Sequence, residues 1–149
     1  MRKYYFLIEV FIIYLCLIFN GFAAKPNYFA EGKILFDKKE FKKSKIFFER
    51  DIVFNPKSEK SYLYLAKIFK KNNNNQEFEI NLSNVLLLNP QNDEAIYMLT
   101  LLKIKQSDYN EAKELMERFN LVCSAFCLKK SEIKKKFDKL NPDNAKGNN

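Results

Sequence analysis

The stretch YLYLAKIFKKNNNNQEFEINLSNVLLLNP, residues 62–90, decides how this chain folds. It ends on the dipeptide Asn89-Pro90, and another such dipeptide, Asn55-Pro56, lies about 34 residues earlier. We call this spacing the repeat period, because aromatic and small residues recur at the same offset around both dipeptides. A fixed period of about 20–50 residues is typical of chains built from stacked copies of one supersecondary unit. The sequence therefore predicts a repeat protein.

The apolar residues between the Asn-Pro dipeptides are spaced as they are on helices. They recur at intervals of three and four, for example at Leu65, Ile68 and Phe69. Polar steps separate the helical stretches, and strand-type alternation is absent over any useful length. The 149 residues include only 3 Gly and 4 Pro, which suits helices better than a turn-rich β-sandwich. The sequence therefore predicts an all-α fold.

Three units share this register, at about residues 25–58, 59–92 and 93–126. Positions of the repeat pattern carry Tyr28, Gly32, Leu35, Ser44 and Phe48 in the first unit, Tyr62, Leu65, Ala66, Phe69 and Leu82 in the second, and Leu99, Ala112 and Met116 in the third. This pattern resembles the tetratricopeptide repeat, whose unit has an aromatic residue and Leu-Gly on its first helix and a closing Pro. The resemblance covers about residues 27–124. It implies an α-solenoid of about three helix-turn-helix units.

Several residues depart from the repeat pattern. Glu31 replaces Leu in the first unit, and Asp51 replaces a small residue there. Phe78 stands in the second unit where a small residue is expected. In the third unit, Thr100 replaces Gly and Lys103 replaces an aromatic residue. The fold is therefore predicted from the register that the three units share.

The last part of the chain predicts a single helix at residues 127–140. Its apolar residues lie on one face, with lysines mostly on the other. Because the last unit of a solenoid has no neighbour to cover it, a terminal element with a polar outer face is required. We expect this helix to be that cap, within a domain spanning residues 24–140. Asn141-Pro142 ends it, and residues 141–149 are expected to be disordered.

Residues 1–23 are expected to be a secretory signal peptide. Arg2 and Lys3 are followed by an apolar run over residues 10–19 and by Gly21-Phe22-Ala23, which supports cleavage after Ala23. The alternative is an uncleaved anchor at residues 4–22, which Glu9 and Asn20 interrupt. Cleavage lowers the formal net charge from +8 to +7. A periplasmic or secreted location follows from the signal, and a membrane-anchored location from the alternative.

Export gives a specific meaning to the two remaining cysteines, Cys123 and Cys127. An even number of cysteines in an oxidising compartment favours a disulfide, which would fix the angle of the cap. Two reduced, buried thiols are one alternative, and a redox pair is another. A metal site is a further alternative, although the chain has no His to complete its ligands.

The resemblance also implies a binding groove lined by the first helix of each unit. The expected lining residues, together with Asp37, are Phe29, Lys33, Phe36, Leu63, Lys67, Lys70, Lys71, Tyr97, Leu101, Ile104 and Lys105. Lysines separated by apolar side chains fit an extended or helical segment of acidic character with apolar anchors. The alternative interpretation is that these lysines form an ordinary solvated face.

The sequence offers little support for catalysis. We find no Gly-rich phosphate loop and no nucleophile with a partner base, so neither an enzyme nor a cofactor is expected. Nucleic-acid binding lacks a recognisable motif. The predicted function is an exported, non-catalytic adaptor that binds a segment of another protein, with an envelope assembly as the setting suggested by analogy. The alternatives are a membrane-anchored structural subunit, contacting lipid through residues 4–22 or the basic tail, and a thiol redox protein.

Overall fold

The computed structural model describes residues 4–5, 11–12 and 27–140. The predicted tail at residues 141–149 lies outside these residues. So does the predicted signal at residues 1–23, apart from the two short pairs, which do not test it. Within the described ranges, no helix is both long enough and apolar enough to cross a bilayer.

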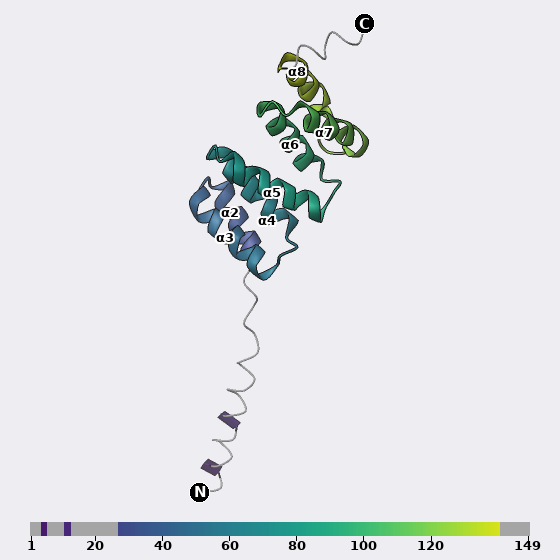
Figure 1. The fold of residues 1–149 in the computed structure, drawn as a ribbon. Helices are drawn as coiled ribbons and strands as arrows, with labels where there is room; N and C mark the ends of the chain where they lie inside the picture. The colour runs from purple at the N-terminus through teal and green to yellow at the C-terminus, as the bar shows by residue number, and fades with distance from the viewer. Residues whose placement is uncertain (1–3, 6–10, 13–26, 141–149) are drawn as a thin grey trace.

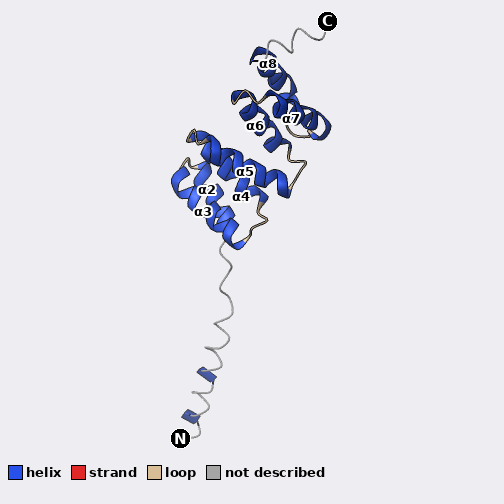
Figure 2. Ribbon diagram, in the orientation of Figure 1, coloured by secondary structure: helices blue, strands red, loops and turns tan. Residues whose placement is uncertain are grey.

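The described part of the chain is all helical (Figure 2). Its helices are α2 (Tyr28–Asp37), α3 (Phe41–Phe54), α4 (Glu59–Lys71), α5 (Asn75–Leu88), α6 (Asp93–Lys105), α7 (Tyr109–Val122) and α8 (Lys130–Leu140). A short 3-10 turn, η1 (Cys127–Lys129), leads into α8. The predicted fold class, three helix pairs followed by a single C-terminal helix, is confirmed.

The helices are stacked in chain order (Figure 1). The closest packing is within the pairs α2–α3, α4–α5 and α6–α7, and each pair also packs against the next one. The final helix, α8, packs against both α6 and α7. Because contacts join neighbours in sequence, each unit covers the apolar face of the next, as solenoid stability requires.

The turn within each helix pair has the same backbone conformation. Lys39, Asn73 and Ser107, each one repeat period after the last, have positive φ angles of 62°, 56° and 62°. Such a left-handed residue after a helix lets the chain turn while satisfying the last carbonyls. Asn tolerates this conformation, whereas Lys and Ser adopt it at a cost. The turn is therefore a repeated feature, although no glycine marks it in the sequence.

A small side chain sits at the same point of each first helix. Gly32, Ala66 and Thr100 are spaced by the repeat period, and all three are buried. A Cβ built on Gly32 would lie 2.8 Å from an aromatic carbon of Phe48, so the first pair leaves no room for a larger residue. The next position in this series, on α8, is the exposed Lys134. Unlike α2, α4 and α6, α8 therefore has a large charged residue at this position.

Two clusters of buried side chains form the core. The smaller one is centred on Phe48, Leu65 and Ile68, with aromatic rings packed around it. The ring of Tyr64 lies 4.9–5.7 Å from three neighbouring aromatic rings in edge-on and stacked arrangements. The larger cluster runs from α4 through α8. Phe69 packs against both clusters, so the core is continuous along the stack.

Acidic residues at the start of α4 and α6 join each unit to the next. The Glu59 carboxylate accepts hydrogen bonds from the side-chain amides of Asn89 (3.1 Å) and Asn92 (2.5 Å). The Asp93 carboxylate, one repeat period after Glu59, accepts from the backbone N–H groups of Ser124 (2.7 Å) and Phe126 (2.9 Å). The chemistry differs, but in both units a carboxylate holds the loop that follows the second helix.

Lys103, which departs from the repeat pattern, joins three helices. Its side chain is 10% exposed, and its Nζ lies 2.6 Å from Glu79 on α5 and 2.7 Å from Glu111 on α7. Burial lowers the pKa of Lys103, but hydrogen bonds to Glu111 and Glu79 outweigh it, and the pKa is raised. The hydrogen bond from Lys103 lowers the pKa of Glu79. A charge in place of an aromatic residue is therefore tolerated because it is paired twice.

Candidate functional site

A cavity of about 280 Å³ lies among the α4–α5 turn, α6 and α8. We call it the three-lysine cavity. It is lined by Lys70, Asn73, Asn75, Phe78, Met98, Leu101, Leu102, Lys105 and Lys136. The lysines come from α4, α6 and α8, and the apolar residues from α5 and α6. This combination of cationic groups and apolar surface suits a ligand that carries both negative charge and an apolar side chain.

The three lysines are not equivalent. The Lys136 Nζ lies 2.9 Å from the Glu132 carboxylate, so its charge is partly neutralised. Lys70 places its Nζ 5.8 Å from the centre of the Phe78 ring. Among the described residues, neither Lys70 nor Lys105 forms an ion pair. Both side chains are exposed, which leaves them accessible to an anionic ligand.

The sequence predicted three of the cavity residues, Lys70, Leu101 and Lys105. It missed Asn73, Asn75, Phe78, Met98, Leu102 and Lys136. One available signal was the repeat period itself, because Lys136 stands one period after Leu102. Continuing the period past the third unit would have identified α8 as a fourth inner helix.

Other predicted lining residues lie elsewhere. Lys33 pairs with Asp37 at 2.7 Å on the exposed side of α2. Lys67 pairs with Glu94 at 2.9 Å and thus connects α4 with α6. Lys71 is exposed, with its Nζ 4.9 Å from the centre of the Phe41 ring on α3. The structure does not bring these lysines into the cavity.

The aromatic and aliphatic predictions are corrected in part. Leu63 and Ile104 are buried in the larger core cluster, and neither lines the cavity. Phe29 and Phe36 are half-buried and pack against the smaller cluster. The period correctly assigned these residues to the first helices of the units, α2, α4 and α6. The period did not show that α6 is covered by its neighbours on most sides, so that Ile104 is buried.

Tyr97, also predicted to line the groove, belongs to the attachment of α8. Its hydroxyl donates to the Glu132 carboxylate at 3.0 Å, and its ring packs near those of Phe119 and Phe126. Hydrogen bonds from Lys136 and Lys129, with a smaller contribution from Tyr97, lower the pKa of Glu132 to about 2. The carboxylate therefore stays ionised well below neutral pH, and its hydrogen bond from Tyr97 joins α8 to α6.

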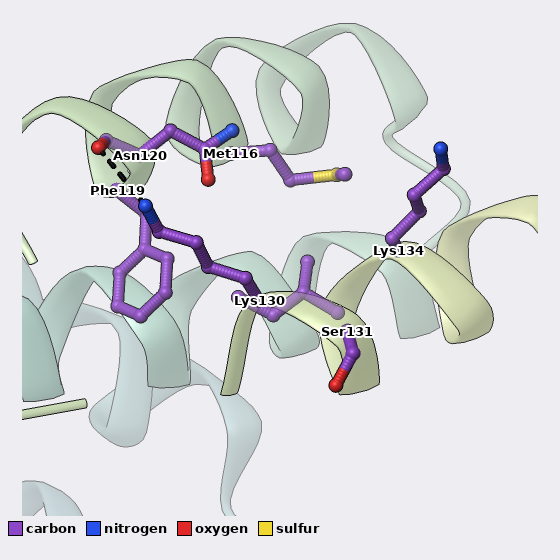
Figure 3. Close-up of a pocket in the computed structure, with 7 residues that line it drawn as sticks. Met116, Phe119, Asn120, Lys130, Ser131 and Lys134 are labelled. Carbon is purple, nitrogen blue, oxygen red and sulfur yellow. Dashed lines mark hydrogen bonds between the residues drawn. The ribbon is translucent and has the colours of Figure 1, made fainter. Parts of the chain in front are cut away.

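A second cavity, of about 200 Å³, lies between α7 and α8 (Figure 3). It is lined by Met116, Phe119, Asn120, Lys130, Ser131, Ile133 and Lys134. Lys130 reaches across it and donates to the backbone carbonyl of Asn120 at 3.3 Å. This contact ties α8 to the end of α7.

Cys123 and Cys127 face each other across the loop between α7 and α8. Their sulfur atoms are 2.14 Å apart and their Cα atoms 5.1 Å apart. The loop also contains the backbone N–H groups that donate to Asp93. The two cysteines and Asp93 thus act on the same few residues, at the base of the capping helix. Within the described residues, no group of His, Cys, Asp and Glu is placed to hold a metal ion.

Comparisons with known proteins identify the fold. A scan against protein-family models found no match, and a search of curated proteins found no relative. Among solved structures, a chain of the CopN-Scc3 complex is similar, with 17% identity, a TM-score of 0.60 and coverage of 76% of this chain. The match spans 66% of that chain, just under two thirds of its length.

The Sgt2 TPR domain from Aspergillus fumigatus is similar to the same degree. It shows 16% identity and a TM-score of 0.60, and the match covers 81% of this chain and 79% of that one. At such identities the likeness establishes the fold, and the activity must be argued from the site. The helix pairs, their shared register and these two likenesses agree that the chain has the tetratricopeptide-repeat fold.

Proposed function

We propose that this protein is a non-catalytic adaptor that holds an acidic segment of a partner protein in the three-lysine cavity. The observation that carries this proposal is the combination, in one cavity, of two exposed lysines with the apolar residues Phe78, Met98 and Leu101. The lysines, Lys70 and Lys105, form no ion pair within the part of the chain that the structure describes. Carboxylates of a bound segment would pair with the lysines. One aliphatic or aromatic side chain would occupy the space between them, as an anchor.

The proposed location is the periplasm or the cell exterior. The supporting observations are the signal-like residues 1–23 and the positions of Cys123 and Cys127, which suit a disulfide under oxidising conditions. A bridge closing so short a loop would contribute only about 1–2 kcal/mol. An envelope assembly is a natural setting for such an adaptor.

Two alternative functions make different predictions. A membrane-anchored structural subunit would retain Met1, whereas an exported adaptor begins at Ala24. A thiol redox protein would lose its activity when both cysteines are replaced by Ser, with helicity and peptide binding unchanged. A structural disulfide predicts a lower melting temperature with binding retained. N-terminal sequencing of the mature protein and thermal unfolding of the double variant separate these possibilities.

Peptide binding tests the proposal directly. The probe is a set of fluorescent synthetic peptides that combine Asp and Glu with one Leu or Phe, and the measurement is fluorescence anisotropy. We expect binding that weakens with added salt, because surface charge pairs are screened. Replacing the acidic residues of the peptide by Asn and Gln should abolish it.

The matched variants locate the binding site. The double variant Lys70→Glu, Lys105→Glu should weaken binding about tenfold or more, since like charges in an interface are unfavourable. The control, Lys113→Glu with Lys135→Glu, makes the same change in net charge at exposed positions outside the cavity. Circular dichroism confirms that all variants stay helical. Equal peptide binding by both double variants would contradict the proposal and would show that Lys70 and Lys105 belong to an ordinary solvated face.

A further inference from the structure

We propose that the outer face of the second helices binds a second copy of this chain, forming a two-fold symmetric dimer. This surface is separate from the three-lysine cavity, and the dimer goes beyond the proposed adaptor function. The proposal is carried by a row of exposed aliphatic side chains that recurs with the repeat. The opposite charges that flank the row at its two ends identify the occupant.

The row, which we call the outer ridge, lies on α3, α5 and α7. Its members are exposed as follows: Ile46 49%, Val53 72%, Ile80 45%, Leu87 81% and Leu121 87%. On α3 and α5 the two members are separated by two helical turns, which places them on one face of their helix. Between helices the members are spaced by the repeat period, so each stands at the same position of its unit.

Exposed aliphatic residues are common singly, but a repeated set is informative. Equivalent positions of successive units lie along one side of a solenoid, so the members of the ridge adjoin one another. None of them belongs to either core cluster. Neighbouring apolar side chains on a surface mark an interaction site.

The charges beside the ridge differ from one end to the other. On α3 the exposed charged residues are Lys42, Lys43 and Arg50. Lys43 is paired with Glu40, and Glu49 is paired with Lys45. On α7 they are Glu114 and Glu117, together with Lys113. The half-buried Arg118 donates a hydrogen bond to the Pro90 carbonyl. Glu114 stands one repeat period after Ile80, in the place of a ridge residue. The α3 end is therefore basic and the α7 end mainly acidic.

A second copy related by a two-fold axis through α5 satisfies both features. The axis makes α5 antiparallel to its counterpart, with Leu87 and Ile80 near the centre. It also sets α3 of each copy against α7 of the other, so that Ile46 meets Leu121 and Arg50 meets Glu117. The two-fold symmetry creates two such contacts, and in each the basic end of one copy faces the acidic end of the other. An apolar partner or a lipid surface would use the ridge but would leave this charge asymmetry without a role.

Sedimentation velocity tests the dimer. The sample is the full-length protein as purified, with its N-terminus processed as the expressing cells process it. We expect a concentration-dependent monomer–dimer equilibrium. Leu87→Glu should weaken dimerisation at least about tenfold, because it places two carboxylates at the centre of an apolar contact. The matched control is Leu128→Glu, which changes an equally exposed leucine outside the ridge and should leave the dimer intact.

Charge reversal tests the orientation of the two copies. Arg50→Glu and Glu117→Arg should each weaken the dimer, and the double variant should restore it, since the pair is re-formed with its signs exchanged. A wild-type monomer at every concentration would overturn the proposal. So would a dimer that Leu87→Glu leaves unchanged, or a double variant no tighter than the single ones. Loss of binding to phosphatidylglycerol vesicles in Leu87→Glu, with no dimer in the wild type, would assign the ridge to a membrane instead.

Discussion

The isosteric change Asp93→Asn tests how the capping helix is attached to the repeats. Asp93 is 8% exposed, and its carboxylate accepts two backbone hydrogen bonds from the loop that leads to η1 and α8. The Ser124 hydroxyl lies 3.4 Å from the same oxygen. The Asn side chain keeps the shape but loses the charge. The two backbone N–H donors then face either the neutral amide oxygen, which is a weaker acceptor, or the amide NH₂ group, which cannot accept a hydrogen bond.

The expected loss of stability is large for the replacement of one carboxylate oxygen by an NH₂ group. Hydrogen bonds to charged groups contribute about 1.5–3 kcal/mol each, and the amide oxygen retains part of one. We therefore expect the free energy of unfolding to fall by about 2–3 kcal/mol, with a decrease in Tm of roughly 8–12 °C for a domain of this size. Urea denaturation followed by circular dichroism measures the difference. Asp138→Asn, at an exposed position of α8, is the control and should change stability by less than about 0.5 kcal/mol.

The pH dependence supplies the second half of the test. Burial raises the pKa of Asp93, but hydrogen bonds from the backbone N–H groups of Phe126, Ser124 and Ala125 outweigh it, so the folded pKa lies below the ordinary 3.8. A depressed folded pKa contributes stability above pH 3.8, and this contribution is lost as the pH falls through the folded value. The difference between wild type and Asp93→Asn should therefore be full at pH 7 and shrink below pH 3.8. An equal difference at pH 3 and pH 7, or none at pH 7, would refute the reasoning.

Two further predictions concern the helix pairs. Lys103→Met removes both ion pairs of Lys103 and should lower the free energy of unfolding by about 1–3 kcal/mol. The loss is limited because the partly exposed carboxylates of Glu79 and Glu111 can regain water. Urea denaturation measures the difference, and unchanged stability would show that the two pairs make no net contribution. Lys39→Gly should raise stability by about 0.5–1 kcal/mol, because glycine adopts the positive φ without strain. The neighbouring Lys38→Gly, at a φ of −77°, should lower stability, and a gain there as well would contradict the backbone argument.

The sequence predicted the fold because small residues recur at the position of each unit where two helices pack closely. Gly32, Ala66 and Thr100 keep the repeat register, and all three are buried, Gly32 next to Phe48 of α3. Thr100 fits although it is larger, since its hydroxyl donates to the Ile96 carbonyl at 2.8 Å. The period alone was enough to order these helices.

The candidate site was predicted less well, because it depends on tertiary contacts that the period does not encode. Ile104 occupies the same repeat position as Lys70, yet one is buried and the other lines the cavity. At α6, the packing of α8 encloses the helix, and Ile104 belongs to the core cluster that continues into α8. Lys136 was missed for the same reason: it reaches the cavity only because α8 packs as an additional inner helix.

Site-specific photo-cross-linking in intact cells tests the central claim most directly. A photoreactive amino acid replaces Leu101, inside the three-lysine cavity, or Leu128, which is 92% exposed and outside it. We predict that position 101 cross-links to a protein segment rich in Asp and Glu that contains an apolar residue, identified by mass spectrometry, and that position 128 does not. Cross-links from position 101 only to lipid, only to basic segments, or to the same segments as position 128 would contradict the proposed adaptor function.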